Sequence, residues 1–450
     1  MKKFKRFLCG TLACVSASMA TACGINGNES VAESYVNPTI AEFSLPNYDL
    51  SEHIITFADF PPQPNADSLQ LYKDCGFNTY FMDLGYVSHD PALGAESDYF
   101  KKIKEVDDMG MDVLIHTMSN FYDGVDFSQF DNIVGFVATD EPPKSKFEWL
   151  ANDCVSWINK GMQDYLYYVN LFPSYAGSSL GTAIGGGKTA FENYIDDYYD
   201  MVLSKVEGKK QIGFDHYPLL KRSEDYFLSD TYLYDLMTVA QKAKKENIDK
   251  FSTCIQSFKN GDIRFIESTS EITFQLYTAM AFGVNIFEFF CYLSRSGYTA
   301  MIHEGQQTDT WYAVQEALAE INLFDEVYLN FKWDGVQTFF GSENDKNHNT
   351  SHFDYIKKNT IDLPKIKKAA CTQDTIIGGL KDQFGNSGYV VVNYTDPMHY
   401  KFDTVEIEFE KAKNVVVYKN GVETKYAING NKLLLNLMPG EGVFVIVLED

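Results

Sequence analysis

Short apolar segments rich in β-forming residues alternate with longer segments of helical periodicity over most of the chain. Nearly every apolar segment is followed by a helical pattern, and only the third reaches the next strand through a short connection. Continuous apolar runs separated by amphipathic helices predict parallel strands that are buried on both faces. The eight predicted strands lie within residues 53–60, 78–86, 111–118, 133–143, 165–175, 211–219, 250–258 and 285–293.

Eight strands of this kind predict an α/β fold, a (β/α)8 TIM barrel over residues 51–340. An open doubly wound sheet is the competing arrangement. Polar and aromatic residues gather at the C-terminal ends of nearly all the strands. Barrel enzymes build their active sites at that end, which favours the barrel.

The pattern changes past about residue 333. The stretch GSENDKNHNTSH, residues 341–352, is polar, and from residue 375 short apolar strands are joined by turns of Gly, Asn and Pro without helical periodicity. This texture predicts a linker over 341–374 and a small C-terminal antiparallel β-sandwich over 375–450.

The start of the chain has the pattern of a secretory signal peptide over residues 1–22. Basic KKFKR is followed by an uncharged segment and by Ala20-Thr21-Ala22. The next residue, Cys23, makes this stretch similar to a bacterial lipobox, although Ala20 stands where Leu is common. Ordinary signal cleavage remains the alternative. We expect a lipoprotein of the cell surface or periplasm, anchored to the membrane through a lipid on Cys23, with a tether and lead-in over residues 23–50.

Charge and cysteine usage exclude several classes of function. Removing residues 1–22 takes away four of the 38 basic residues and none of the 62 acids, so the mature balance is 34 − 62 = −28. Such a surface repels phosphate backbones, which argues against a nucleic-acid partner. Three of the eight cysteines fall within residues 1–23, and the other five stand at wide spacings without a zinc pattern. We expect no metal and no cofactor. The stretch GTAIGGGKTA, residues 181–190, lacks the first glycine of a phosphate loop and is interpreted as a lip of the barrel.

The candidate reaction centre is VGFVATDEPP, an apolar strand that ends in Asp140 and Glu141. Asp140 has an alternative role as the cap of the helix that begins near Lys144, and Asp215 one as a buried hydrogen-bonding residue. The expected substrate-binding residues lie near other strand ends and are His116, Asn170, His216, Tyr217, Gln256, Glu288 and Tyr292. Sugar stacking is a further possible role for the aromatic residues Tyr86, Phe121, Tyr122, Tyr175, Tyr217 and Tyr292.

These strand ends resemble the large clan of glycoside hydrolases that are built on (β/α)8 barrels. That clan places a Glu acid/base after strand four, within Asn-Glu-Pro, and a Glu nucleophile after strand seven. Asp140-Glu141-Pro142 matches the first motif, which implies that Glu141 is the acid/base. FDHYP (214–218) and FEFFCY (287–292) resemble strand-six and strand-eight elements of uncharacterised relatives of the family 42 β-galactosidases. The sandwich that ends in PGEGVFVIVL resembles the terminal β domain that often follows such barrels.

The chain departs from the clan at strand seven, where Gln256 holds the position of the nucleophile. In one alternative, Asp140 and Glu141 act as the paired acids of a substrate-assisted hexosaminidase, with Tyr217 holding the acetamido oxygen. In another, Asp215 faces Glu141 as the nucleophile or as the base of an inverting pair. Glu288 ranks lowest, because it precedes the strand end and points toward the interior.

The function expected from the sequence is a cell-surface glycoside hydrolase that acts on an oligo- or polysaccharide, with Glu141 as general acid/base. The rival hypothesis is a non-hydrolytic carbohydrate-binding lipoprotein that kept the barrel and lost the nucleophile. Gln256 is what separates the two, since an amide cannot form a glycosyl ester.

Overall fold

The structure is a computed structural model that describes residues 38–448, apart from 84–86, 88–89, 117–121, 123–124, 181–187, 223–224, 262–263, 265, 344–349, 359–362, 364 and 429. The predicted signal peptide and Cys23 therefore lie outside the described residues. Within the described part of the chain, we find no helix that combines the length and the apolar character needed to span a bilayer.

All eight segments that the sequence marks as strands contain a strand. These strands form two four-stranded parallel sheets, in the orders β3-β4-β5-β6 and β2-β11-β10-β7. The strands are β2 (Ile55–Ala58), β3 (Thr79–Met82), β4 (Asp112–His116), β5 (Ile133–Asp140), β6 (Leu166–Asn170), β7 (Gln211–Phe214), β10 (Lys250–Gln256) and β11 (Ile286–Phe290). The prediction of a mixed α/β fold with parallel strands is confirmed.

The two sheets meet along both edges. Leu171, directly after β6, pairs in parallel with Phe214 of β7, and its N–H donates to the Gly213 carbonyl at 3.1 Å. At the other edge the Asn78 side chain bridges the start of β3 to β2: its Oδ1 accepts from Thr56 N at 2.9 Å and its Nδ2 donates to Ile54 O at 2.7 Å. An amide side chain thus takes the place of a strand ladder at this edge. Closure into a regular barrel stays a prediction.

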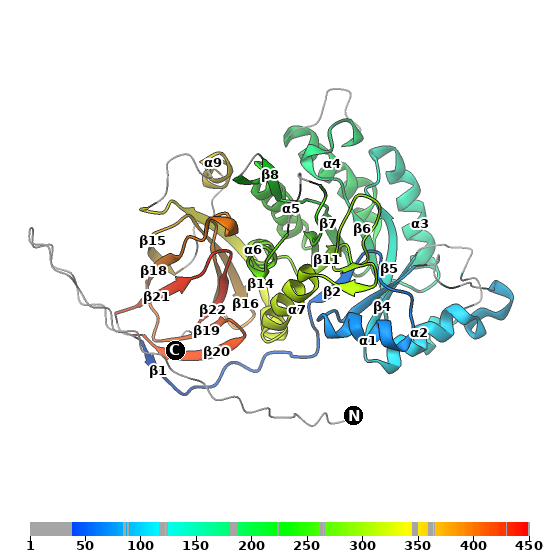
Figure 1. Ribbon diagram of the computed structural model, residues 1–450, viewed down its shortest axis with the longest axis horizontal. Coiled ribbons are helices and arrows are strands. Elements are labelled where there is room, and N and C mark those ends of the chain that lie inside the picture. Colours follow the sequence, from blue (N-terminus) through cyan, green and yellow to red (C-terminus); the bar gives the residue numbers. More distant parts are fainter. Residues whose placement is uncertain are drawn as a thin grey trace, which may run out of the picture. The chain divides into compact units, whose positions relative to one another are not determined.

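Helices follow most of the strands, and Figure 1 shows them on the outside of the parallel sheets. Two short antiparallel strand pairs lie in the described loops, β8 (Leu219–Arg222) with β9 (Asp225–Leu228) and β12 (Ile302–His303) with β13 (Gln306–Gln307). The helices are α1 (Ala66–Asp74), α2 (Asp98–Asp108), α3 (Phe147–Asn159), α4 (Lys188–Met201), α5 (Tyr232–Glu246), α6 (Thr269–Met280), α7 (Asp309–Ile321), α8 (Asp325–Tyr328) and α9 (Thr350–Lys358).

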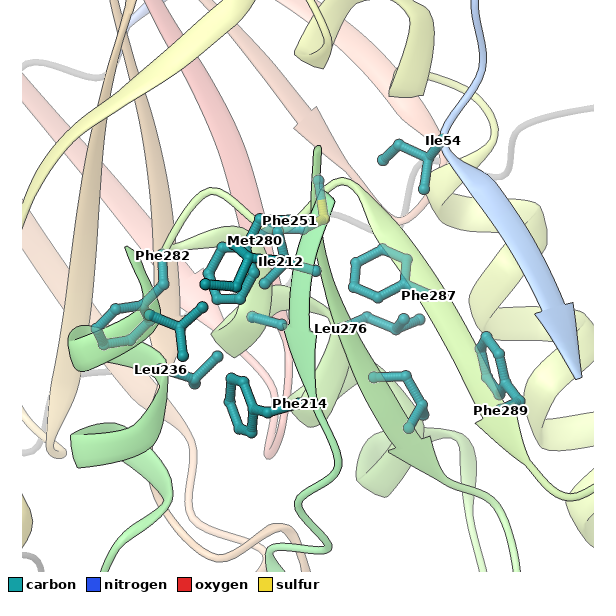
Figure 2. Close-up of a cluster of buried hydrophobic side chains, with 14 of the residues drawn as sticks. Ile54, Ile212, Phe214, Leu236, Phe251, Leu276, Met280, Phe282, Phe287 and Phe289 are labelled. Carbon is teal, nitrogen blue, oxygen red and sulfur yellow. The ribbon is translucent and has the colours of Figure 1, made fainter. Parts of the chain in front are cut away.

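Apolar side chains fill both faces of the strands. Figure 2 shows Phe214 of β7, Phe251 of β10 and Phe287 of β11 beside Leu236 of α5 and Leu276 of α6. All five side chains are buried. Burial of each contributes about 1.5–3 kcal/mol relative to exposure. The opposite face of the strands packs into a second cluster, formed by Phe57, Phe81, Leu114, Leu166, Tyr168 and Ile286.

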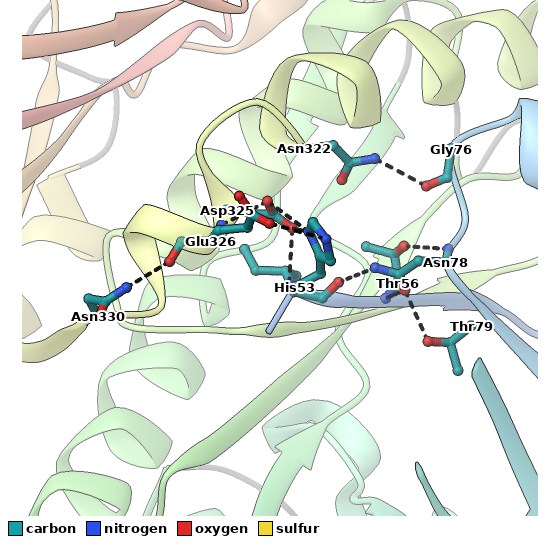
Figure 3. A network of polar contacts seen from close by, with 10 residues as sticks. His53, Thr56, Gly76, Asn78, Thr79, Asn322, Asp325, Glu326 and Asn330 are labelled. Carbon is teal, nitrogen blue, oxygen red and sulfur yellow. Dashed lines mark hydrogen bonds and ion pairs between the residues drawn. The ribbon is translucent and has the colours of Figure 1, made fainter. Parts of the chain in front are cut away.

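A polar network fastens the start of β2 to α8 (Figure 3). The buried Asp325 carboxylate accepts from Ile54 N at 3.1 Å and from Glu326 N at 2.8 Å, and His53 Nδ1 lies 3.1 Å from its Oδ2. The neighbouring Glu326 reaches only the other ring nitrogen of His53, at 3.4 Å, and is half exposed. Asp325 therefore provides a hydrogen-bond acceptor for the backbone N–H of Ile54, the residue directly before β2.

We expect Asp325→Ala to destabilise the protein by about 2–4 kcal/mol, because it leaves buried backbone donors without an acceptor. Glu326→Ala is the matched control and should cost less than about 0.5 kcal/mol, since it removes only a half-exposed contact. Chemical unfolding of both variants measures the difference. Equal costs would show that the Asp325 network does not hold β2.

The C-terminal region consists of two antiparallel sheets. One has seven strands in the order β1-β20-β19-β22-β17-β16-β14, and the other has the order β15-β18-β21. Side chains of both sheets share one apolar core, as a sandwich requires. The strands are β1 (Thr39–Ile40), β14 (Phe331–Phe339), β15 (Ile366–Cys371), β16 (Thr375–Asp382), β17 (Ser387–Asn393), β18 (Asp403–Phe409), β19 (Asn414–Lys419), β20 (Val422–Ala427), β21 (Lys432–Leu437) and β22 (Gly442–Leu448).

The C-terminal sheets begin earlier in the chain than residue 375. β14 pairs with β16 in the seven-stranded sheet, although it lies inside the range expected for the barrel. The expected linker, 341–374, carries α9 and β15. Its polar composition conceals these elements, because β15 reads IKKAAC and presents lysines to solvent.

Candidate active site

The strand β5 ends where Asp140 and Glu141 turn into the following loop. Glu141 has a left-handed backbone with φ of 44°, and its N–H donates to Asn170 O at 2.8 Å. A left-handed conformation at a residue other than glycine costs about 1–3 kcal/mol and persists only where the surroundings impose it. The loop beyond is held by Tyr194 of α4, whose hydroxyl donates to Pro142 O at 2.6 Å. These contacts hold the backbone at Glu141 and Pro142 in place.

Glu141 has the electrostatics of a proton donor. Partial burial, together with the charge of neighbouring Asp140, raises the pKa of the Glu141 carboxyl to about 7, while the charge of Arg264 acts in the opposite direction. Burial also raises the pKa of Asp140. The Asn170 side chain opposes this rise by donating a hydrogen bond to Asp140 Oδ1 at 3.1 Å. The charge of Asp140 disfavours ionisation of Glu141, which keeps a proton available on Glu141 near neutral pH.

Asp215 follows β7 and is 7% exposed. Burial, followed by the charges of Glu141 and Asp140, raises the pKa of Asp215 well above its ordinary value, and a hydrogen bond from Tyr217 acts against this. Among the described residues, Asp215 Oδ1 has no hydrogen-bond partner. A buried carboxyl oxygen without a partner is costly unless something else uses it.

A second pair of carboxyls lies deeper in the same end of the sheets. Glu288 of β11 is buried on the inner face with Ile286, where Tyr168 Oη donates to its Oε2 at 2.5 Å. Glu288 also hydrogen-bonds to Asp59, which directly follows β2. Burial raises the pKa of Asp59 to about 7 and the pKa of Glu288 well above its ordinary value, and the hydrogen bond between the two carboxyls needs a proton on one of them.

An open cavity of about 270 Å³ is lined by Tyr175, Tyr217 and Arg264 together with Leu220, Ser229, Asp230 and Thr231. Of these lining residues, Tyr217 hydrogen-bonds to Asp215. The Arg264 guanidinium lies 4.6 Å from the centre of the Tyr217 ring. Tyr175 is 46% exposed. Exposed aromatic faces beside a carboxyl cluster are suited to a sugar ring, whose C–H faces pack on aromatic rings.

His116 and Asn170 lie at the β4 and β6 ends of this same edge. Asn170 is the donor to Asp140 described above. His116 packs edge-on against Phe81 with 4.8 Å between ring centres, and its Nε2 lies 3.9 Å from Asp83 Oδ1. Burial lowers the pKa of the His116 ring, which keeps it neutral at pH 7.

Three of the residues expected to bind substrate direct their side chains elsewhere. His216 is fully buried, with Nδ1 2.7 Å from Asp235 Oδ2 and Nε2 2.8 Å from Ser229 Oγ. Gln256 exchanges two 3.1 Å hydrogen bonds with the backbone of Leu219. Tyr292 packs on Tyr72 in the core, with 5.0 Å between ring centres. The structure gives each of these side chains a structural role.

The expected aromatic contacts divide in the same way. Tyr175 and Tyr217 line the cavity, Tyr122 is buried against Tyr99, and Tyr86 and Phe121 lie outside the described residues. The described residues contain no cluster of three or more His, Cys, Asp or Glu side chains arranged to hold a metal ion.

Sequence reasoning missed Asp59, Tyr168 and Arg264. Asp59 had a usable signal, because it is an acid directly after the first apolar strand. Tyr168 gave none, since a tyrosine inside an apolar strand is ordinarily core packing. Arg264 lies in the connection after β10, whose path relative to Glu141 depends on the tertiary fold.

No protein-family model and no curated protein matches the chain. Among solved structures, it is similar to a β-galactosidase from Bacillus circulans sp. alkalophilus (7% identity, TM-score 0.48, covering 88% of this chain and 99% of that one). It is also similar to a GH30 endoxylanase from Clostridium papyrosolvens C71 (8%, 0.38, 90% and 98%) and to a GH27 β-L-arabinopyranosidase from Geobacillus stearothermophilus (11%, 0.39, 88% and 95%). Identities this low concern the fold alone, and TM-scores below 0.5 carry no argument about this chain's chemistry.

Proposed function

We propose that the protein hydrolyses glycosidic bonds at the C-terminal edge of a closed (β/α)8 barrel, with Glu141 as proton donor and Asp215 as the second carboxyl. The observation that carries this proposal is Asp215, a buried acid. One of its carboxyl oxygens has no hydrogen-bond partner among the described residues, and the charges of Glu141 and Asp140 contribute to its raised pKa. Glycoside hydrolysis needs two carboxyls on opposite sides of the scissile bond, one protonated and one ionised.

Glu141 suits the protonated role, because a pKa of about 7 leaves it able to protonate the leaving oxygen at neutral pH. In this proposal Asp215 takes the ionised role, against the burial and the neighbouring charges that raise its pKa. The Tyr217 hydroxyl stabilises the Asp215 anion through one oxygen, which leaves the other free for the anomeric carbon or for a water. Asp215 then acts as the nucleophile of a retaining reaction or as the base of an inverting one.

Two other assignments fit the contacts less well. Glu288 already bonds to Tyr168 and Asp59 inside the sheet, so that it lacks a free oxygen at the edge. In the substrate-assisted alternative, Tyr217 holds the acetamido oxygen, but its hydroxyl is bonded to Asp215. Asp140 retains a role in that alternative, because it is accessible and held by Asn170.

Gln256 has a structural explanation that weakens the rival binding-protein hypothesis. Its amide both donates to and accepts from the Leu219 backbone, in the manner of a paired strand. A glutamate in this place would offer no donor to the Leu219 carbonyl. The path of the chain after Asp215 therefore explains a glutamine at position 256. This explanation does not require that a nucleophile was lost there.

A screen of aryl glycosides, with and without a 2-acetamido group, tests the proposal. Hydrolysis of any of them by the wild-type protein, and its loss in Asp215→Asn, is the expected result. Binding of glycans without turnover of any substrate would favour the rival hypothesis. Dependence of turnover on the 2-acetamido group, with Asp215→Asn still active, would favour the substrate-assisted reaction.

The pH profile supplies an independent prediction. Activity should fall above an apparent pKa of about 7, because the donor Glu141 must be protonated. Arg264→Gln removes the charge that lowers the pKa of Glu141, so the alkaline limb should move to higher pH. Lys259→Gln, a cation in the same connection that pairs with Glu267 at 3.7 Å, should leave the limb in place. If the alkaline limb of Arg264→Gln stays where it is in the wild type, the limb does not report the ionisation of Glu141.

We also propose that the protein acts at the cell surface or in the periplasm, anchored through Cys23 as the first residues predict. In the native host, Cys23→Ser should release the protein from the membrane fraction. Intact mass measurement checks the anchor directly, and an unmodified mature Cys23 would contradict it.

A further inference from the structure

A second cavity lies away from the carboxyl cluster. It measures about 570 Å³, and its wall includes the residues at or just before the starts of β2, β7, β10 and β11. Parallel strands start at one edge and end at the other. The carboxyls Asp140, Glu141 and Asp215 lie at the ends of strands, so this cavity lies at the opposite edge.

The inner wall of the cavity is apolar and rigid. Phe251 and Phe282, which also appear in Figure 2, are buried, and Phe331 opens β14. Trp333 of β14 closes one side, held by its Nε1 donating to Ala281 O at 3.0 Å. An apolar wall carried by strands and a fixed indole is the construction of a preformed small-molecule site.

The rim of the cavity is strongly basic. Five lysines line it, namely Lys209, Lys210, Lys244, Lys250 and Lys332, against two lining acids, Glu52 and Asp249. This gives 5 − 2 = +3, and counting Asp334, which pairs with Lys244, still leaves +2. The chain as a whole has a net charge of −24. A positive concave patch on an acidic protein concentrates anions that the rest of the surface repels.

The ion pairs at the rim leave donors free. Lys250 pairs with Glu52 at 3.1 Å and Lys332 with Asp249 at 2.9 Å, which uses one of the three N–H donors of each ammonium group. Lys209 and Lys210 have no ion-pair partner among the described residues, and Lys210 Nζ lies 5.9 Å from the centre of the Tyr199 ring. They come from the segment before β7, while the other lysines come from α5, β10 and β14. Donors from four segments thus surround one space.

We propose that this cavity binds a small molecule that carries an oxyanion, either a carboxylate or sulfate of an acidic saccharide or a phosphate group. Lys209 and Lys210 would contact the oxyanion, with Lys250 and Lys332 adding their spare donors. The neutral part of the ligand would rest on the Phe251 wall and on Trp333. The site is independent of the proposed hydrolysis at the other edge.

Calorimetric titration of the full chain with two probes tests this inference and separates the two sources of the oxyanion. The probes are a disaccharide of glucuronic acid and inorganic pyrophosphate, both at about 50 mM salt, where screening is weak. We expect at least one to bind, and raising the salt to about 0.5 M should weaken it. Saturable binding by the saccharide alone identifies an acidic sugar site, and by pyrophosphate alone a phosphate site. Absence of binding by both overturns the proposal.

The double variant Lys209→Ala/Lys210→Ala should weaken binding at least tenfold. The matched control, Lys101→Ala/Lys102→Ala on α2, removes the same charge from a surface away from the cavity and should leave binding unchanged. Both pairs are at the surface, so melting temperatures should stay near wild type and verify folding. Equal weakening in the two variants would reveal a general charge effect and overturn the site. Unchanged binding in Lys209→Ala/Lys210→Ala would also overturn the proposed site.

Discussion

Replacing Glu141 with Gln should lower the hydrolysis of a substrate with a poor leaving group by about 10²- to 10⁴-fold. The amide keeps the size and hydrogen-bonding reach of the side chain but has no proton to give to the leaving oxygen. Substrates with activated aryl leaving groups need less protonation and should lose much less. The ratio of the two losses, measured as kcat/KM on a pair of substrates with one sugar, is the diagnostic quantity.

The control for this experiment is Glu148→Gln, a glutamate on the exposed face of α3 a few residues further along the chain. It changes the charge by the same amount outside the site and should keep wild-type rates on both substrates. A Glu141→Gln variant that loses equal activity on both substrates would act through structure or binding, and one with normal turnover would remove Glu141 from the mechanism.

The parallel strands were predictable because their physics is local. Each is an apolar run followed by a helical pattern. Such a pattern is typical of parallel strands that are buried on both faces. The C-terminal strands β14 and β15 were harder to predict. β14 follows α8 directly, and the lysines of β15 are exposed to solvent. The boundary between the two regions is therefore set by tertiary strand pairing, which the sequence pattern does not reveal.

The candidate site residues show the same difference between what local sequence indicates and what tertiary contacts decide. Asp140, Glu141 and Asp215 were candidates because each lies at a strand end, a position that the sequence displays. Which of them has a free oxygen depends on contacts from distant segments. Gln256 and His216 also lie near strand ends, yet Leu219 and Asp235 occupy their polar atoms. Position at an edge is therefore readable from sequence, whereas the direction of a side chain depends on partners far along the chain.

Substitution of Asp215 by Asn should reduce hydrolysis by a similar factor, but without dependence on the leaving group. The missing group acts at the anomeric carbon or on a water, and both actions need a carboxylate. Folding should be preserved, since Asn resembles the protonated acid that burial favours and keeps an acceptor for Tyr217. Asp200→Asn, on the exposed side of α4, is the control and should keep wild-type rates.

Azide gives the Asp215 variant a second readout. A small anion that enters the space left by the carboxylate can attack the anomeric carbon, so added azide should restore turnover and yield a glycosyl azide of inverted configuration. The configuration of the wild-type product, followed by NMR, then distinguishes a nucleophile from a base: retention requires a covalent intermediate on Asp215, and inversion requires a water between Asp215 and the sugar. Full activity of Asp215→Asn on a substrate without a 2-acetamido group would exclude both roles. The buried, unpartnered oxygen would then have no function in the reaction.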